Sequence, residues 1–334
     1  MNDTKSISDR LTEFLAAQHR EGEARAEVGT LARAGAGRSR DNWLFDLLGD
    51  VDEKLILRCD PPGGLVETDR RTEFEILRAL ERSGLPTPVA RWLDADGSWF
   101  GRPALIMRRL PGDCDYRVLS DDRRSLADRR ELAESFCELL ADVHAVDWAA
   151  TDVGAVLADP GKRAAETELD RWNKILTNDQ LEPSPALELA FTVLREHAPL
   201  AARTVLVHAD FKPGNILLDG QQVTALLDWE LAHLGDPLED LGWVTQPLRT
   251  SEHLIPGAWS ADDLVSHYES VTGAPVDRHA LAWWVGFAAL KTAVMQVSGL
   301  RSFLEGRSDV PFRPTRRVLN AVLDAVEALE KEQA

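Results

Sequence analysis

The sequence predicts an α+β fold in two parts, a small strand-rich part over residues 1–108 and a larger, mainly helical part over residues 109–334. Three observations support this division. Short apolar runs separated by turn residues dominate the first part. Apolar residues recur at helical spacing along most of the chain after residue 121. The length of 334 residues is enough for one large core or for two lobes of ordinary domain size.

The first part begins with a charged segment whose few apolar side chains stand at helical spacing, so we expect residues 9–24 to form a surface helix that caps the small lobe. Strands are predicted over residues 26–33, 55–58, 91–94 and 103–107, and a helix over residues 69–82. A Gly-rich turn at residues 35–39 lies between the first two strands, where backbone N–H groups can approach phosphate closely. An apolar strand that runs into Pro111-Gly112 predicts the linker between the lobes.

The second part reads as a series of helices. They are predicted over residues 126–148, 151–203 with breaks at the prolines, 260–272, 277–298 and 314–330. The longest apolar run, residues 280–290, stops at Lys291 and is too short to span a bilayer, so it predicts a buried helix. Five arginines between residues 301 and 317 form a basic cluster, either a solvated face or a site for an anionic handle such as a coenzyme A phosphate.

A hairpin in the second part carries the strongest local signal in the chain. Asp219-Gly220 separates two apolar runs, residues 216–218 and 223–227, which is typical of a tight β-hairpin. Asn215 opens this hairpin and Asp228 closes it, so the two should lie side by side with Asp210 close by. Two carboxylates and an amide that converge need a cation, and hard oxygen ligands of this kind suit Mg²⁺.

Composition narrows the possible partners. A formal net charge of −18 argues against nucleic acid or an anionic membrane surface as the main partner. The three cysteines show no metal-binding spacing and predict reduced thiols. Residues 1–14 lack the apolar core of a signal segment, so we expect a cytoplasmic protein, with its oligomeric state left open.

The polar positions around the hairpin resemble a known catalytic core. His208-x-Asp210-x-x-x-x-Asn215 followed by Asp228 matches the spacing of the protein-kinase-like phosphotransferases at each position. Protein kinases have Phe-Gly after the metal-binding Asp, whereas this chain has Trp229-Glu230. Asp-Trp-Glu followed by Leu-Ala-x-x-Gly-Asp-Pro is similar to the aminoglycoside phosphotransferase family. The fullest match is to the kinase-like domains associated with acyl-CoA dehydrogenases.

This resemblance implies the bilobal protein-kinase-like fold, with an antiparallel sheet in the small lobe. It also implies an ATP- and Mg²⁺-dependent kinase that acts on a hydroxyl of a small molecule. In that template Asp210 orients the hydroxyl and takes its proton, while Lys212 reaches the γ-phosphate as a mobile positive charge. Asn215 and Asp228 are the implied Mg²⁺ ligands.

The resemblance also implies an ATP site in the first part. Gly37 and Ser39 match the phosphate loop, although Ala36 stands where the family often has a second Gly. Arg58 stands where the template has the Lys that grips the phosphates, and arginine replaces that point charge with a planar fork. Glu73 matches the helix residue that pairs with this cation; the alternative is a solvated acid in a first helical turn. Adenine is expected against the backbone from Met107 to Arg109.

Several readings remain open on sequence alone. The acceptor is an aminoglycoside or other antibiotic, a hydroxyacyl thioester or other apolar hydroxyl compound, or a choline-like alcohol. A second class is a catalytically silent nucleotide-binding scaffold on the same fold, which Arg58 and Ala36 favour and the intact Asp210, Asn215 and Asp228 oppose. A purely structural α/β domain leaves the metal-ligand spacing without a reason.

Overall fold

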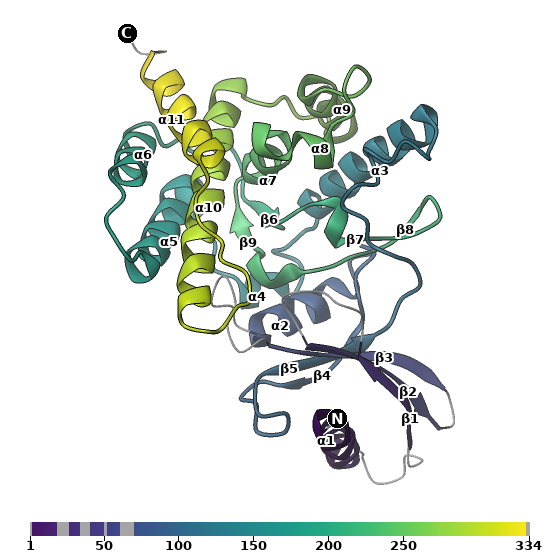
Figure 1. Ribbon diagram of the computed structural model, residues 1–334. Coiled ribbons are helices and arrows are strands. Elements are labelled where there is room, and N and C mark those ends of the chain that lie inside the picture. The colour runs from purple at the N-terminus through teal and green to yellow at the C-terminus, as the bar shows by residue number, and fades with distance from the viewer. Residues whose placement is uncertain (1, 19–26, 34–40, 50–51, 61–69, 332–334) are drawn as a thin grey trace.

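A computed structural model describes residues 2–18, 27–33, 41–49, 52–60 and 70–331 of the chain. Within these residues the chain forms the two expected lobes, with the sheet of the small lobe at the bottom of Figure 1 and most helices above it. The predicted bilobal, protein-kinase-like α+β fold is confirmed. The boundary after residue 108 stays a prediction, although the last strand of the sheet ends there.

An antiparallel sheet forms the small lobe, in the strand order β1-β2-β3-β5-β4. Its strands are β1 (Glu27–Arg33), β2 (Asp41–Leu48), β3 (Glu53–Cys59), β4 (Ala90–Asp94) and β5 (Ala104–Arg108). Helix α2 (Arg70–Leu80) follows β3 and contacts the helical lobe through α4 (Val153–Val156) and η3 (Trp229–Leu231). This placement lets α2 carry charged side chains from the sheet towards the second lobe.

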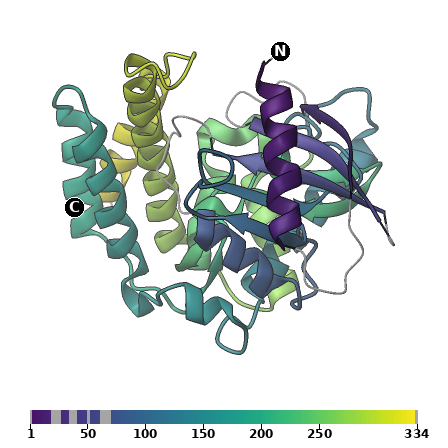
Figure 2. The same ribbon diagram turned by 90° about the horizontal axis from the view of Figure 1, so that it is seen from below.

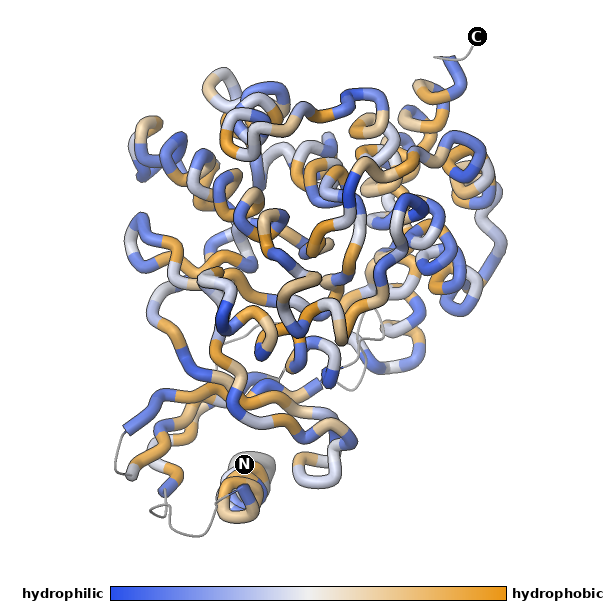
Figure 3. The backbone as a smooth tube through the Cα atoms, turned by 180° about the vertical axis from the view of Figure 1, so that it is seen from behind, coloured by the Kyte–Doolittle hydropathy of each residue, from blue (hydrophilic) through white to orange (hydrophobic). Residues whose placement is uncertain are grey.

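Helix α1 (Asn2–Gln18) packs on the sheet, as Figure 2 shows from below. Leu11 and Phe14 of α1 are almost fully buried in one cluster with Phe45 and Leu57 of the sheet. Apolar stretches, orange in Figure 3, run along the strands beside this helix. The predicted capping helix is confirmed over residues 9–18, but it begins earlier than predicted, at Asn2; residues 19–24 of the predicted range lie outside the described residues.

The linker between the lobes depends on a glycine. Gly112 has a φ of 114° and approaches the hairpin so closely that a Cβ would lie 2.5 Å from the carbonyl oxygen of Leu218. Asp113 then exchanges backbone hydrogen bonds with Leu218, at 2.9 and 3.0 Å. The chain that leaves the sheet is therefore tied directly to the hairpin.

The helical lobe is built around the long helix α10, which contacts α5, α6, α7 and α11, while α3 packs on α9. Its α-helices are α3 (Leu126–His144), α4 (Val153–Val156), α5 (Ala164–Asp179), α6 (Pro185–Glu196), α7 (Pro237–Thr245), α8 (Thr250–His253), α9 (Ala261–Thr272), α10 (Arg278–Leu304) and α11 (Arg316–Lys331). Short 3₁₀ turns are η1 (Gly161–Arg163), η2 (Pro213–Asn215), η3 (Trp229–Leu231) and η4 (Pro247–Arg249).

Among the described residues, α10 alone is long and apolar enough to cross a membrane. However, 67% of its apolar window is buried inside the protein, as in the core helix of a globular lobe. Gly242 of α7 sits so close to α10 that a Cβ would lie 2.6 Å from the backbone of Trp284. The predicted buried helix is confirmed, and α7 is docked tightly on it.

The second lobe also contains two small antiparallel strand pairs. The predicted hairpin is β7 (Ile216–Asp219) with β8 (Gln222–Leu226), paired from Ile216 with Leu226 to Asp219 with Gln222. The second pair joins β6 (Val205–Val207) to β9 (His233–Gly235) and has no counterpart in the sequence predictions. Because β6 leads into His208 and β8 leads into Asp228, the two pairs bring the candidate catalytic residues together.

Candidate active site

The loop after β6 is held by buried hydrogen bonds. The backbone N–H groups of His208 and Ala209 donate to Oδ2 and Oδ1 of Asp240 on α7, both at 2.8 Å. The His208 ring contacts the carbonyl oxygen of Leu227 at 3.0 Å through Nε2. The loop that carries Asp210 is thus braced against both α7 and the end of the hairpin.

Asp210 lies at the centre of a small set of polar contacts. Lys212 Nζ forms an ion pair with its Oδ2. The side-chain amide of Asn215 donates to the Asp210 backbone oxygen at 2.9 Å and to Oδ2 at 3.1 Å. The described side-chain contacts of Asp210 use Oδ2, which leaves Oδ1 as the oxygen that can accept a hydrogen bond from a substrate hydroxyl.

Two backbone conformations mark this site. Among the described residues other than glycine, only Ala209 (φ 66°) and Asp228 (φ 72°) have positive φ. Such residues cost of order 1–3 kcal/mol each and persist where the surrounding structure enforces them, most often at functional sites. Here Ala209 immediately precedes Asp210, and Asp228 closes the hairpin. These are the two points at which the sequence predicts the catalytic and metal-binding residues.

Asp228 and Glu73 both bind Arg58. The guanidinium of Arg58 reaches Glu73 Oε1 at 3.1 Å and Asp228 Oδ1 at 2.7 Å, which joins β3 to α2 and to the hairpin. The predicted pairing of Glu73 with Arg58 is therefore present in the structure. Burial opposes the charge of Arg58, but the carboxylates of Glu73 and Asp228 raise its pKa above the ordinary value.

A second arginine completes this arrangement and was missed from the sequence. Arg70, at the start of α2, donates to Asp60 through Nε at 2.8 Å and forms a close ion pair with Glu73. The spacing of Arg70 and Glu73, three residues apart on a helix, was the signal that could have revealed their contact. We call Arg58, Asp60, Arg70, Glu73 and Asp228 the nucleotide-side cluster.

The nucleotide-side cluster has three carboxylates for two guanidinium groups, an excess of one negative charge. Next to it, burial and the neighbouring Asp228 raise the pKa of Glu230 well above its ordinary value. Asn215 commits its amide nitrogen to Asp210, which leaves the amide oxygen for a cation. Oxygen donors beside uncompensated negative charge fit Mg²⁺.

A cavity of about 460 Å³ lies in front of these groups. Arg58, Glu73, Asn215 and Asp228 line it, as does the segment from Met107 to Leu110. Its volume falls in the range of small-molecule sites. Asp210 and Lys212 are not among its lining residues; hydrogen bonds link them to it through Asn215.

The adenine-side prediction is refined by the backbone. Met107 and Arg109 line the cavity. However, the N–H groups of Arg108 and Arg109 already donate to Val89 and Lys54, at 2.9 and 2.8 Å. An adenine ring placed there has to use other backbone groups of this segment. The phosphate-loop residues Gly37 and Ser39 lie outside the described residues and stay predictions.

The basic cluster near the C-terminus is partly neutralised. Arg301 and Arg307 both form ion pairs with Glu305, and Arg317 donates to the carbonyl oxygen of Pro247 at 3.3 Å. Arg313 and Arg316 are exposed. These contacts favour the solvated face over a dedicated anion site.

The chain matches a family model and is similar in sequence to known proteins. A family model described as "Phosphotransferase enzyme family" matches residues 30–274. Acyl-CoA dehydrogenase family member 10 of Mus musculus is 31% identical over 213 residues, which are 62% of this chain and 19% of that protein. A homoserine kinase of Beijerinckia indica is 32% identical over 167 residues, 47% of this chain and 46% of the kinase. The chain spans 19–31% of the length of the acyl-CoA dehydrogenase family members that it matches.

Solved structures show the same fold. A putative aminoglycoside phosphotransferase from Ralstonia eutropha superposes with a TM-score of 0.67 at 23% identity, covering 96% of this chain and 95% of the other. A streptomycin–ATP–APH(2")-IIa ternary complex superposes with a TM-score of 0.58 at 16% identity, covering 87% and 89%. At these identities the likeness establishes the fold alone.

Proposed function

The chain belongs to the phosphotransferase enzyme family, and from this premise we propose that it transfers the γ-phosphoryl group of ATP, with Mg²⁺, to a hydroxyl of a small molecule. The observation that carries the proposal is the arrangement of Asp210, Asn215 and Asp228. Asp210 contacts Asn215 directly, and Asn215 and Asp228 line one cavity with Arg58. A nucleotide-binding solved neighbour of the same fold supports ATP as the phosphoryl donor.

The nucleotide side of the reaction rests on charge. Arg58 can give up its contact with Asp228 and donate to phosphate oxygens, while Glu73 keeps its guanidinium in place. Asn215 and Asp228 would hold Mg²⁺, which would supply positive charge to neutralise the phosphates of ATP. Phosphoryl transfer needs mostly positioning and charge neutralisation, which these residues supply.

The acceptor side rests on Asp210. A substrate hydroxyl donates to Oδ1 of Asp210, its oxygen attacks the γ-phosphorus, the bond to the ADP oxygen breaks, and the hydroxyl proton passes to Asp210. Lys212 is bound to Oδ2 of the same carboxylate and places a positive charge beside the transferred group. Both residues come from one short loop, so their relative position is set before substrate arrives.

The acceptor class is drawn from the relatives. Homoserine kinase and aminoglycoside phosphotransferases are named for hydroxylated small molecules. The acyl-CoA dehydrogenase family members are named for acyl-CoA, and we add hydroxyacyl compounds as the acyl compounds that carry an acceptor hydroxyl. We therefore propose a hydroxyacyl compound or an antibiotic as acceptor. The negative charge of the chain mildly favours a cationic compound.

One observation favours a second function, a nucleotide-binding scaffold without turnover. Arg58 bonds directly to Asp228, the proposed metal ligand, at 2.7 Å. If this ion pair persisted with nucleotide bound, it would keep Asp228 from a cation. The two functions differ in whether nucleotide breaks the pair.

The test is a screen for Mg²⁺-dependent ADP release from ATP. The acceptors are aminoglycosides, macrolides, homoserine and hydroxyacyl-CoA thioesters, each compared with EDTA-treated samples. We expect one class to stimulate ADP release, and we expect the Asp210→Asn variant to lose this stimulation. Nucleotide binding without ADP release for any acceptor would support the scaffold, and a stimulated Asp210→Asn variant would contradict the assigned chemistry.

A further inference from the structure

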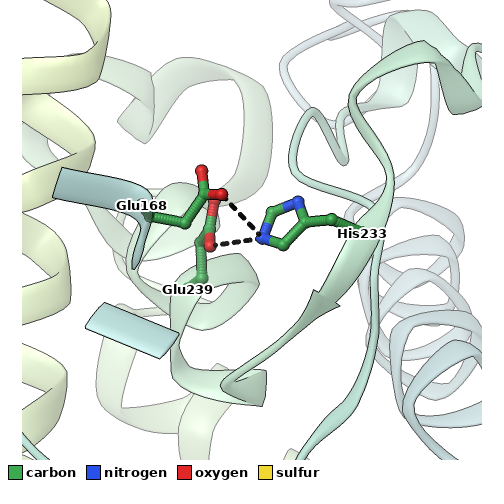
Figure 4. Close-up of side chains that lie close together, drawn as sticks. All are labelled: Glu168, His233 and Glu239. Atoms are coloured by element: carbon green, nitrogen blue, oxygen red, sulfur yellow. Dashed lines mark hydrogen bonds and ion pairs between the residues drawn. The ribbon is translucent and has the colours of Figure 1, made fainter. Parts of the chain in front are cut away.

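A second group of charges lies beneath the catalytic loop. Glu168 on α5, His233 on β9 and Glu239 on α7 point towards one another, as Figure 4 shows, and Lys291 on α10 joins them. His233 Nε2 lies 3.0 Å from Glu239 and 3.6 Å from Glu168, and Lys291 Nζ lies 3.0 Å from Glu239. The side chains of Glu168, Glu239 and Lys291 are at most 5% exposed. We call these four residues the loop-support cluster.

The two carboxylates of Glu168 and Glu239 and the imidazole of His233 are close enough together to hold a metal ion, but their hydrogen bonds argue against one. His233 Nδ1 lies 3.0 Å from the carbonyl oxygen of Leu231, which can only accept, so Nδ1 carries a proton. Nε2 faces two carboxylates, so it carries a proton as well. An imidazole protonated on both nitrogens has no lone pair for a metal.

The charges in the loop-support cluster already balance. Two carboxylates face one imidazolium and one ammonium, and Arg171 is a further, half-exposed cation near Glu168. Burial alone would lower the pKa of His233, but Glu168 and Glu239 raise it to about 9. Burial alone would raise the pKa of Glu239, but Lys291 and His233 lower it. A buried, neutral set of this kind is a structural element rather than an open ligand site.

Lys291 connects this cluster to the catalytic loop. Its Nζ donates to the carbonyl oxygen of Ala209 at 2.8 Å, 82 positions earlier in the chain. The backbone N–H of Ala209 donates to Asp240. Two consecutive residues of α7 therefore fix the backbone of Ala209. Asp240 accepts from its N–H directly, and Glu239 binds the Lys291 ammonium that donates to its carbonyl oxygen. Ala209 is the residue of positive φ immediately before Asp210.

The aromatic surroundings make Lys291 hard to replace. Trp172 and Trp243 hold their rings 5.3 and 5.1 Å from Nζ, within range of cation–π attraction. The Trp172 indole N–H also donates to Glu168 at 3.1 Å. The ammonium is thus fixed on several sides, so the position of the Ala209 carbonyl oxygen is fixed with it.

We propose that Lys291, Glu239 and His233 are positioning residues that hold Ala209 in its left-handed conformation and so aim Asp210 at the acceptor hydroxyl. The consequence for turnover rests on the proposed function, whereas the effect on the loop does not. Loss of the Lys291 contact frees the Ala209 carbonyl oxygen, and the backbone relaxes away from the strained conformation. Asp210 then points correctly for only part of the time, and kcat falls while nucleotide affinity stays.

The test uses the double variant Lys291→Met with Glu239→Gln, which removes the ammonium and its carboxylate together and leaves Glu168 paired with His233. Thr292→Val is the matched control, because the Thr292 hydroxyl bonds only to Ala288 within α10 in the described structure. We expect kcat for ADP release, measured with the acceptor that the screen identifies or with water, to fall at least tenfold. KM for ATP should stay within twofold. Amide hydrogen exchange in residues 207–211 should accelerate at least tenfold, and the control should change neither quantity.

The two readouts separate the two proposals. Faster exchange in a protein whose parent shows no ADP release would support the positioning role and contradict the kinase. Unchanged exchange and unchanged kcat in an active protein would overturn the positioning role alone. A proportional rise in KM with kcat unchanged would overturn it too, because that pattern reports lost binding.

A measurement on the unaltered protein covers the case in which the double variant fails to fold. The NMR signals of His233, assigned with His233→Gln, are followed from pH 5 to 10 with and without Zn²⁺. We expect the ring to keep both protons beyond pH 8 and its NMR signals to stay unchanged when Zn²⁺ is added. Titration near the ordinary value of 6.5, or Zn²⁺ binding that His233→Gln removes, would overturn the proposal.

Discussion

The two charge clusters on either side of the catalytic loop are built from similar groups but differ in balance. The nucleotide-side cluster has one more carboxylate than guanidinium groups and lines a cavity of about 460 Å³ with three of its members. The loop-support cluster pairs two carboxylates with two cations, and all its side chains except the partly exposed His233 are at most 5% exposed. The first cluster lines a cavity and has an excess charge with which to bind a ligand, whereas the charges of the second cluster balance one another.

This difference separates binding from positioning. Ion pairs at the edge of a cavity, such as Arg58 with Asp228, can exchange a protein partner for a phosphate or a cation when ligand arrives. Buried ion pairs cannot exchange partners without leaving an unpaired charge in the interior, which costs several kcal/mol. We therefore expect changes in the nucleotide-side cluster to alter ligand affinity, and changes in the loop-support cluster to alter the catalytic loop.

The largest effect is expected at Asp210, which lies between the two clusters. Asp210→Asn keeps the shape and the contact with Asn215 but removes the negative oxygen proposed to take the proton. Turnover should fall by about 10²–10⁴-fold. Nucleotide affinity, measured by calorimetry with Mg²⁺ and a non-hydrolysable ATP analogue, should stay within a factor of about two. Normal turnover would show that the proton goes elsewhere.

The second prediction concerns the loop-support cluster and pH. The folded pKa of His233 is about 9, above the unfolded value of 6.5, so its contribution to stability is complete below pH 6.5 and is lost as the pH rises through 9. This shift corresponds to on the order of 3 kcal/mol. Denaturant unfolding of the parent and of His233→Gln should therefore converge over this window. A stability difference that stays constant from pH 6.5 to 9 would contradict the imidazolium.

A somewhat smaller effect is expected at Asp228. Asp228→Asn removes the charge proposed to bind Mg²⁺ and the partner of Arg58. Mg²⁺-dependent nucleotide affinity should fall by about 10- to 100-fold, as for other losses at metal sites. Asp219→Asn, at the exposed far end of the same hairpin, is the matched control and should bind as the parent does. Equal affinities for the two variants would remove Asp228 from the metal site.

The smallest effect is expected at Arg58. Arg58→Lys keeps the charge but loses the fork that reaches Glu73 and Asp228 at once. KM for ATP should rise about tenfold, equivalent to 1.4 kcal/mol. Arg91→Lys alters an ion pair with Glu53 on the same sheet, outside the cavity lining, and should leave KM unchanged. An unchanged KM in Arg58→Lys would show that a point charge is enough.

Local parts of the site could be predicted from the sequence because short stretches of chain determine them. Asp219-Gly220 between two apolar runs specifies a hairpin, and a hairpin brings Asn215 and Asp228 together whatever surrounds it. The four residues between Asp210 and Asn215 similarly restrict their separation. The resemblance to a known family added Arg58 and Glu73, which are 15 positions apart and whose contact no local pattern specifies.

The remaining contacts were decided by the tertiary structure. Lys291 marked only the end of an apolar run in the sequence, and its contact with Ala209 exists because α10 packs against α7 and brings the lysine beneath the loop. The positive φ of Ala209, a residue with no intrinsic preference for it, is likewise enforced by Asp240 and Lys291. Periodicity identifies which face of a helix is buried, but not which distant backbone atom lies opposite a buried charge. That depends on how the helices pack, and it is why the proposed catalytic residues could be named from the sequence while Lys291, Glu239 and His233, which we propose aim Asp210, could not.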